Sequence, residues 1–175
     1  METDRHENNF IGLSAIPAYP TAAQPLKYPA MELLDYDFHY AVTEADSEPN
    51  FPLWSAECYF GIVCYRSATT EEAKRDAAIR VAQSVWEAAE SDLSVGAWLI
   101  AVASNWAGGV KDGRAPFGWL TMQWDHEMEA KYIAKTLRHF SLAETAPSLE
   151  IKTKHLAALF CNANILWRRC SDIQQ

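Results

Sequence analysis

The hydrophobic pattern changes its period near Ala68, and this change limits the folds that the chain can adopt. After this point apolar residues recur every three or four positions, which is the spacing of one face of an α-helix. The first such set comprises Ala73, Ala77, Ala78, Val81, Val85 and Ala89. Before Ala68, apolar residues alternate with polar ones or run together, which is typical of β-strands. The pattern therefore predicts strands early in the chain and helices late.

Four helices are predicted, over residues 70–91, 95–107, 125–140 and 148–170. The first follows a capping-box pattern, Thr69 with Glu72. The second is apolar nearly all round, so we expect it at the centre of the core. The third begins after Asp125, whose side chain suits the N-cap position. Pro147 lies near the start of the fourth, where proline is tolerated.

Two strands are predicted ahead of these helices, over residues 36–43 and 54–65, and a further one over 116–124. In the first strand, alternation would place Tyr36, Phe38, Tyr40 and Val42 on one face. Residues 54–65 are rich in aromatic and β-branched side chains, as in a central strand. The expected fold class is α+β, with a small antiparallel sheet of three or four strands and about four helices packed mainly on one face.

The chain length of 175 residues suits a single domain. Residues 1–30 carry Pro17, Pro20, Pro25 and Pro29, which favour an extended N-terminal arm, so the predicted domain covers 31–175. No apolar run approaches the length of a membrane span, and the N-terminus does not resemble a signal peptide. Four cysteines without a C-x-x-C pair indicate free thiols. We therefore expect a cytoplasmic protein, in a bacterial or host cell.

The charge is strongly segregated along the sequence. Between Tyr28 and Tyr65 there is no Lys or Arg, whereas seven carboxylates occur: Glu32, Asp35, Asp37, Glu44, Asp46, Glu48 and Glu57. Residues 1–65 hold ten acidic and two basic side chains, and residues 66–175 hold thirteen of each. An acidic surface repels the phosphate backbone, so direct binding of nucleic acid is not expected. The same surface steers cationic partners toward the protein.

Motifs for catalysis or metal binding are weak. Asp125, His126 and Glu127 are consecutive and would point about 100° apart on a helix, so they do not converge. Residues 108–113 resemble a phosphate-binding loop only superficially, because the Gly-Lys-Ser/Thr ending is missing. Two cysteine sets, Cys161 with His155 and Cys58 and Cys64 with His39, have spacings that do not suit a site. We predict no catalytic residues, no metal and no cofactor.

The prediction for function is a non-catalytic acidic inhibitor or interaction protein. It would cover a basic, nucleic-acid-handling surface on a larger protein partner. Two settings fit: an anti-defence protein of a phage or mobile element, such as an anti-CRISPR, and an immunity protein for a nuclease toxin. The predicted partner-binding residues are the seven carboxylates together with Trp54, which follows the acidic loop and would serve as an apolar anchor.

Two alternatives remain open. One is an enzyme whose site is assembled from dispersed residues, with His39, Glu57, Asp125 and His126 as candidates. The other is a structural or assembly subunit that forms homo-oligomers through the apolar helices 95–107 and 148–170.

Overall fold

Every secondary-structure element is a helix in the residues that the computed structural model describes, which are 37–38, 40–42, 54–93, 98, 101–102, 105 and 118–173. The elements are α3 (Trp54–Ser67), α4 (Glu71–Asp92), the short 3₁₀ helix η1 (Gly118–Leu120), α6 (His126–Glu144) and α7 (Leu149–Arg169). None of these residues lies in a strand. The predicted α+β class, with its antiparallel sheet, is therefore wrong, and the described part of the chain is an all-helical bundle.

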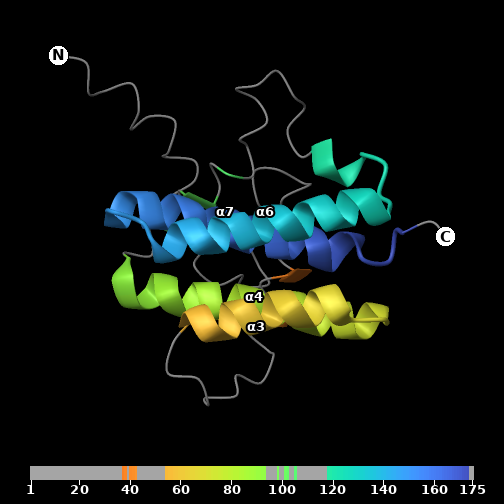
Figure 1. The fold of residues 1–175 in the computed structure, drawn as a ribbon, viewed down its shortest axis with the longest axis horizontal. Coiled ribbons are helices and arrows are strands. Elements are labelled where there is room, and N and C mark those ends of the chain that lie inside the picture. The colour runs from red at the N-terminus through yellow and green to blue at the C-terminus, as the bar shows by residue number, and fades with distance from the viewer. Residues whose placement is uncertain are drawn as a thin grey trace, which may run out of the picture.

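The four long helices form two antiparallel pairs, α3 with α4 and α6 with α7 (Figure 1). The pairs stack so that α4 packs on α7 and α3 packs on α6. Every neighbouring pair of long helices is antiparallel. The diagonal pair α4 and α6 runs in the same direction (Figure 1). This arrangement is a four-helix bundle with one long connection between its two halves.

Side-chain caps fix where three of the helices begin. The backbone N–H of Ala73 donates to Thr70 Oγ1 at 3.2 Å, that of Met128 to Asp125 Oδ1 at 2.9 Å, and that of Ile151 to Ser148 Oγ at 3.3 Å. Each cap satisfies a donor that the first helical turn leaves free. The helices predicted over 70–91, 125–140 and 148–170 are confirmed, although the first is capped by Thr70 rather than Thr69.

Residues 54–65, predicted as a central strand, form helix α3. Its buried residues Cys58, Ile62 and Tyr65 recur at helical spacing. Gly61 lies on the same side, where a Cβ atom would stand 2.8 Å from Val81 Cγ2 of α4. The aromatic and β-branched composition that favoured a strand is overridden by this close packing against α4.

The strand predicted over 36–43 is also wrong, because Asp37, Phe38 and residues 40–42 are helical. A strand would place Phe38, Tyr40 and Val42 on one face, but Phe38 is 0% exposed, Val42 6% and Tyr40 54%. The Phe38 ring packs 5.3 Å from Phe160 of α7. This segment therefore covers α7 with one helical face.

Residues 116–124 were predicted as a further strand. From Gly118 onward they form η1 and a turn that leads into α6. Of the apolar helix predicted over 95–107, the described residues Trp98, residues 101–102 and Asn105 are helical, and Trp98 packs 5.6 Å from Phe160. Residues 1–36 and 108–113, which include the predicted arm and glycine-rich loop, lie outside the described residues.

Helix α7 is the centre of the core. Eleven consecutive residues, 156–166, are buried, so the helix is enclosed on every side. All four cysteines are free thiols, and Cys58, Cys161 and Cys170 are buried. None of the helices in the described part of the chain is long and apolar enough to cross a membrane.

Candidate functional site

Three of the eight predicted partner-binding residues lie in the part of the chain that the structure describes. These are Asp37, Trp54 and Glu57, whereas Glu32, Asp35, Glu44, Asp46 and Glu48 lie outside it. Asp37 forms an ion pair within the fold, since Arg168 Nη2 of α7 donates to its Oδ2 at 2.9 Å. Glu57 lies half-buried in the first turn of α3, where a carboxylate interacts favourably with the helix dipole.

Trp54 also makes contacts within the fold. Its ring meets the edge of Phe140 of α6 at 6.0 Å, and Lys152 Nζ of α7 lies 5.8 Å from the ring centroid. These contacts hold the start of α3 against α6 and α7. Its side chain is partly exposed, and its role as an apolar anchor for a partner stays a prediction.

The candidates for a dispersed enzyme site are not brought together. Glu57 is in the first turn of α3, and the start of α3 lies beside the end of α6, whereas Asp125 and His126 are at the opposite end of α6 (Figure 1). Asp125 is occupied as the N-cap. His39 lies outside the described residues. The described residues also contain no group of three or more His, Cys, Asp or Glu side chains that could hold a metal ion.

The cysteine sets weighed earlier do not form sites either. Cys161 is buried in α7, and its Sγ lies 3.8 Å from the carbonyl oxygen of Val102. Burial raises the pKa of the Cys58 thiol to about 12, which suppresses the reactive thiolate. Both cysteines therefore behave as small apolar side chains.

An exposed apolar face on α3 is the feature that sequence reasoning missed. Tyr59, Phe60 and Val63 are 52%, 45% and 43% exposed, although they belong to a helix that is already packed on two neighbours. The signal was present in the sequence, because residues 58–65 carry no charge and so leave α3 apolar on every side. Once these residues are placed on a helix, part of that apolar surface must face outward.

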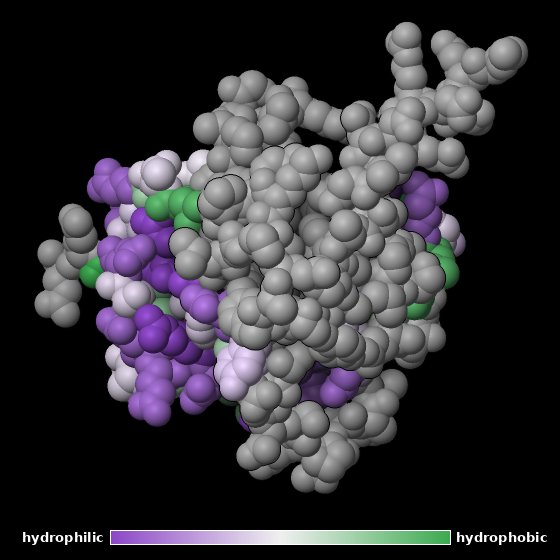
Figure 2. All heavy atoms as spheres, turned by 180° about the vertical axis from the view of Figure 1, so that it is seen from behind, coloured by the Kyte–Doolittle hydropathy of each residue, from purple (hydrophilic) through white to green (hydrophobic). Residues whose placement is uncertain are grey.

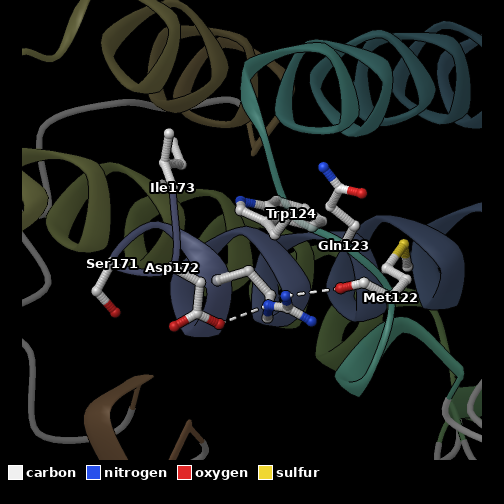
Figure 3. Close-up of a pocket in the computed structure, with 7 residues that line it drawn as sticks. Met122, Gln123, Trp124, Ser171, Asp172 and Ile173 are labelled. Atoms are coloured by element: carbon white, nitrogen blue, oxygen red, sulfur yellow. Dashed lines mark hydrogen bonds and ion pairs between the residues drawn. The ribbon is translucent and has the colours of Figure 1, made fainter. Parts of the chain in front are cut away.

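A polar hollow of about 440 Å³ opens where α7 ends (Figure 3). Its lining residues are Met122, Gln123, Trp124, Arg169, Ser171, Asp172 and Ile173. Seen from behind, hydrophilic side chains gather at this end of the bundle, where α4 begins and α7 ends (Figure 2). A second hollow of about 500 Å³, lined in part by Glu71, Arg75 and Trp167, involves the start of α4.

The guanidinium of Arg169 lies in the first hollow, and its two Nη atoms make three hydrogen bonds to backbone carbonyls. Nη1 donates to the carbonyls of Trp119 at 2.6 Å and Leu120 at 2.8 Å, and Nη2 donates to Met122 at 2.9 Å. Nε forms an ion pair with Asp172 Oδ2 at 2.6 Å (Figure 3). Arg169 therefore fastens the segment after η1 to the end of α7, and it is a structural group rather than a ligand for an anion.

A second polar cluster ties all four helices together in the core. Tyr65 Oη of α3 lies 3.0 Å from Glu129 Oε1 of α6 and 3.1 Å from the carbonyl of Leu166 of α7. Lys74 of α4 completes the cluster by donating to Glu129. Burial, reinforced by the Glu129 carboxylate, raises the pKa of Tyr65 above its ordinary value. The hydroxyl thus stays protonated and donates, and the cluster specifies how the helices dock.

Comparisons with protein-family models, with curated proteins and with solved structures returned no match. The described part of the chain is a four-helix bundle with an apolar outer face on α3 and an internal ion-pair cluster.

Proposed function

We propose that the chain is a non-catalytic acidic inhibitor that covers an Arg- and Lys-rich surface of a larger, nucleic-acid-handling protein. The observation that carries the proposal is the segregation of charge. Residues 1–53 hold nine acidic and two basic side chains, whereas the helical residues 54–93 and 118–173 hold 13 acidic and 11 basic ones. The acidity therefore belongs to the part of the chain that directly precedes α3, and a one-signed surface selects a cationic partner.

The exposed face of α3 supports the same proposal. A stable interface needs an apolar centre as well as a charged rim. The exposed side chains of Tyr59, Phe60 and Val63 follow the acidic stretch in the sequence and would supply that apolar centre. The sequence predicts the same role for Trp54. The partner would be the target of an anti-defence protein, such as an anti-CRISPR, or a nuclease toxin neutralised by an immunity protein.

Charge reversal tests the ionic part of the proposal. The variant with Asp35, Glu44, Asp46 and Glu48 changed to Lys leaves Asp37 with its partner Arg168. We expect it to lose capture of nucleic-acid-handling proteins from bacterial lysate, while its circular dichroism spectrum stays helical. Wild-type capture should weaken at high ionic strength, because salt screens exposed charges.

A matched control carries the same change in net charge on the helices. It replaces the exposed Glu72, Glu87, Glu127 and Glu144 by Lys. Capture by this control should persist. If both variants capture alike, or if capture by the wild type is insensitive to salt, an acidic binding surface in residues 32–48 is ruled out.

Homo-oligomerisation through α3 is the second candidate, and the exposed Tyr59, Phe60 and Val63 favour it. The apolar helix 148–170, which the sequence also suggested for this role, is α7 and is largely buried inside the bundle. An oligomer held by α3 would survive high salt and dissociate in the variant Phe60→Glu with Val63→Glu. Sedimentation of both proteins decides between this assembly and the inhibitor.

A further inference from the structure

Two histidines face each other across the α6–α7 interface. His139 of α6 and His155 of α7 have their Nδ1 atoms 3.1 Å apart, and their ring centroids are separated by 5.3 Å with an interplanar angle of 41°. Both side chains are half-buried, so the pair is held by the helices and still reached by solvent. His139 lies in the second half of α6 and His155 near the start of α7, so the short turn between the two helices keeps these residues close together.

The surroundings of both imidazoles favour the neutral form, because both pKa values are lowered. Burial lowers the pKa of His139, and His155, Arg138 and Lys135 lower it further. Burial also lowers the pKa of His155, with a contribution from Arg138. Two neutral rings in contact can share one proton, with one Nδ1 donating and the other accepting. A neutral imidazole is also the form that binds metal ions.

The separation of the two nitrogens matches the spacing of two ligands on one metal ion. Zinc binds histidine nitrogen at about 2.0–2.1 Å, so two such ligands lie about 3.3 Å apart in a tetrahedral site. In a square-planar site, where adjacent ligands meet at a right angle, they lie about 2.9 Å apart. The observed 3.1 Å falls between these values. A metal ion could thus replace the shared proton if each ring turned so that its Nδ1 lone pair pointed at the ion instead of at the other nitrogen.

We propose that His139 and His155 bind a divalent transition-metal ion, Zn²⁺ in the first instance, and thereby clamp α6 to α7. Two protein ligands leave the remaining coordination positions to water. Lys135 and Arg138 oppose a cation, which sets the expected affinity well below that of a closed structural zinc site. The site goes beyond the proposed function, since it does not involve the acidic stretch or α3.

The test uses the full chain, freed of metal and titrated with ZnCl₂ near neutral pH. Isothermal titration calorimetry should show that the wild type binds one equivalent of Zn²⁺. This binding should be lost in His139→Gln and in His155→Gln. Saturating Zn²⁺ should raise the Tm of the wild type by about 3–8 °C, because a ligand stabilises the state that binds it. His126→Gln is the matched control: it removes an exposed histidine from the same helix and should leave both effects unchanged.

A second measurement covers the case in which a glutamine variant fails to fold. In the wild type, Zn²⁺ should shift the NMR imidazole resonances of His139 and His155 and leave that of His126 in place. The proposal is overturned if Zn²⁺ does not bind, if either glutamine variant binds it as the wild type does, or if His126→Gln abolishes binding. The histidine pair would then be only a direct N–H···N hydrogen bond.

Discussion

Lys74 Nζ lies 2.7 Å from one carboxylate oxygen of Glu129 and 2.9 Å from the other, so that a single buried pair joins α4 to α6 across the diagonal of the bundle. The two side chains are only 16% and 9% exposed. Each charge therefore depends on the other to offset its loss of hydration.

Breaking this pair should be costly. Glu129→Gln leaves Lys74 without its carboxylate, and we expect a loss of about 3 kcal/mol in the free energy of unfolding, measured with urea. The double variant Lys74→Met with Glu129→Leu should recover most of that loss, because neither charge is then left buried alone. Glu150→Gln is the control: it removes an ion pair of the same 2.7 Å length that is exposed, and it should leave stability unchanged.

Gly61→Ala should destabilise the bundle, although alanine ordinarily favours a helix by about 1 kcal/mol. The new Cβ would lie 2.8 Å from Val81 Cγ2 and 3.1 Å from both the Ala77 carbonyl oxygen and the Val81 nitrogen. Because two of these atoms are backbone, α3 and α4 must separate, at a net cost of about 1–3 kcal/mol. Thermal unfolding should show this, and Gly118→Ala, which meets nothing within 4 Å, should not lower stability through such a clash.

Arg169→Lys keeps the charge but not the planar fork that reaches three carbonyl oxygens and Asp172. We expect a loss of about 2–4 kcal/mol in stability and a change in tryptophan fluorescence, because Trp119 and Trp124 are buried beside the fork. Arg168→Lys is the matched control, since its ion pair with Asp37 is partly exposed. Equal effects of the two substitutions would contradict the assigned role of Arg169.

Asn164→Leu should leave stability unchanged or raise it by up to about 2 kcal/mol. Asn164 is 0% exposed, and neither atom of its amide group has a hydrogen-bond partner in the structure. Leucine has the same branched shape, with methyl groups in place of the amide oxygen and nitrogen, and so removes these unsatisfied groups from the core. Asn164→Asp should instead be strongly destabilising, since it buries a charge. A destabilised leucine variant in chemical denaturation would show that the amide has a partner in solution.

Cys58 should resist alkylation in the folded protein. With its pKa raised to about 12, roughly one thiol in 10,000 is ionised at pH 8. Because the thiol holds its proton more tightly in the folded state than in the unfolded state, the free energy of unfolding should also fall as the pH rises above 9. Peptide mapping after iodoacetamide treatment should find the half-buried Cys64 modified before Cys58. Rapid modification of Cys58 without unfolding would refute its burial.

Local sequence signals were sufficient to predict helices α4, α6 and α7. Each combines a polar cap with a long amphipathic pattern, so the sequence alone locates these helices. The region before residue 68 lacked such signals. Phe38, Tyr40 and Val42 alternate in sequence, yet Phe38 and Val42 pack against the core while Tyr40 faces away. A segment of so few residues is compatible with both the strand period and the helix period, and only tertiary packing decides between them.

The candidate site was harder to predict because its contacts join distant parts of the chain. Trp54 packs on Phe140 of α6, and Asp37 pairs with Arg168, 131 residues away. His155 was compared with Cys161 on its own helix, whereas its neighbour is His139 on the preceding one. Amphipathic patterns indicate which face of a helix is buried, but they do not reveal which residues of another helix will meet it.

The parallel course of α4 and α6 divides the bundle into two hairpins that meet only along their faces. Each hairpin closes through a short turn, so its contacts are local and can form quickly. The chain is thus suited to being expressed as two separate polypeptides, one ending after Leu93 and one beginning before Gly118. Such halves would reassemble by helix packing together with the Lys74–Glu129 pair that joins them, and the bundle could serve as a split reporter whose signal follows the docking of α4 on α7.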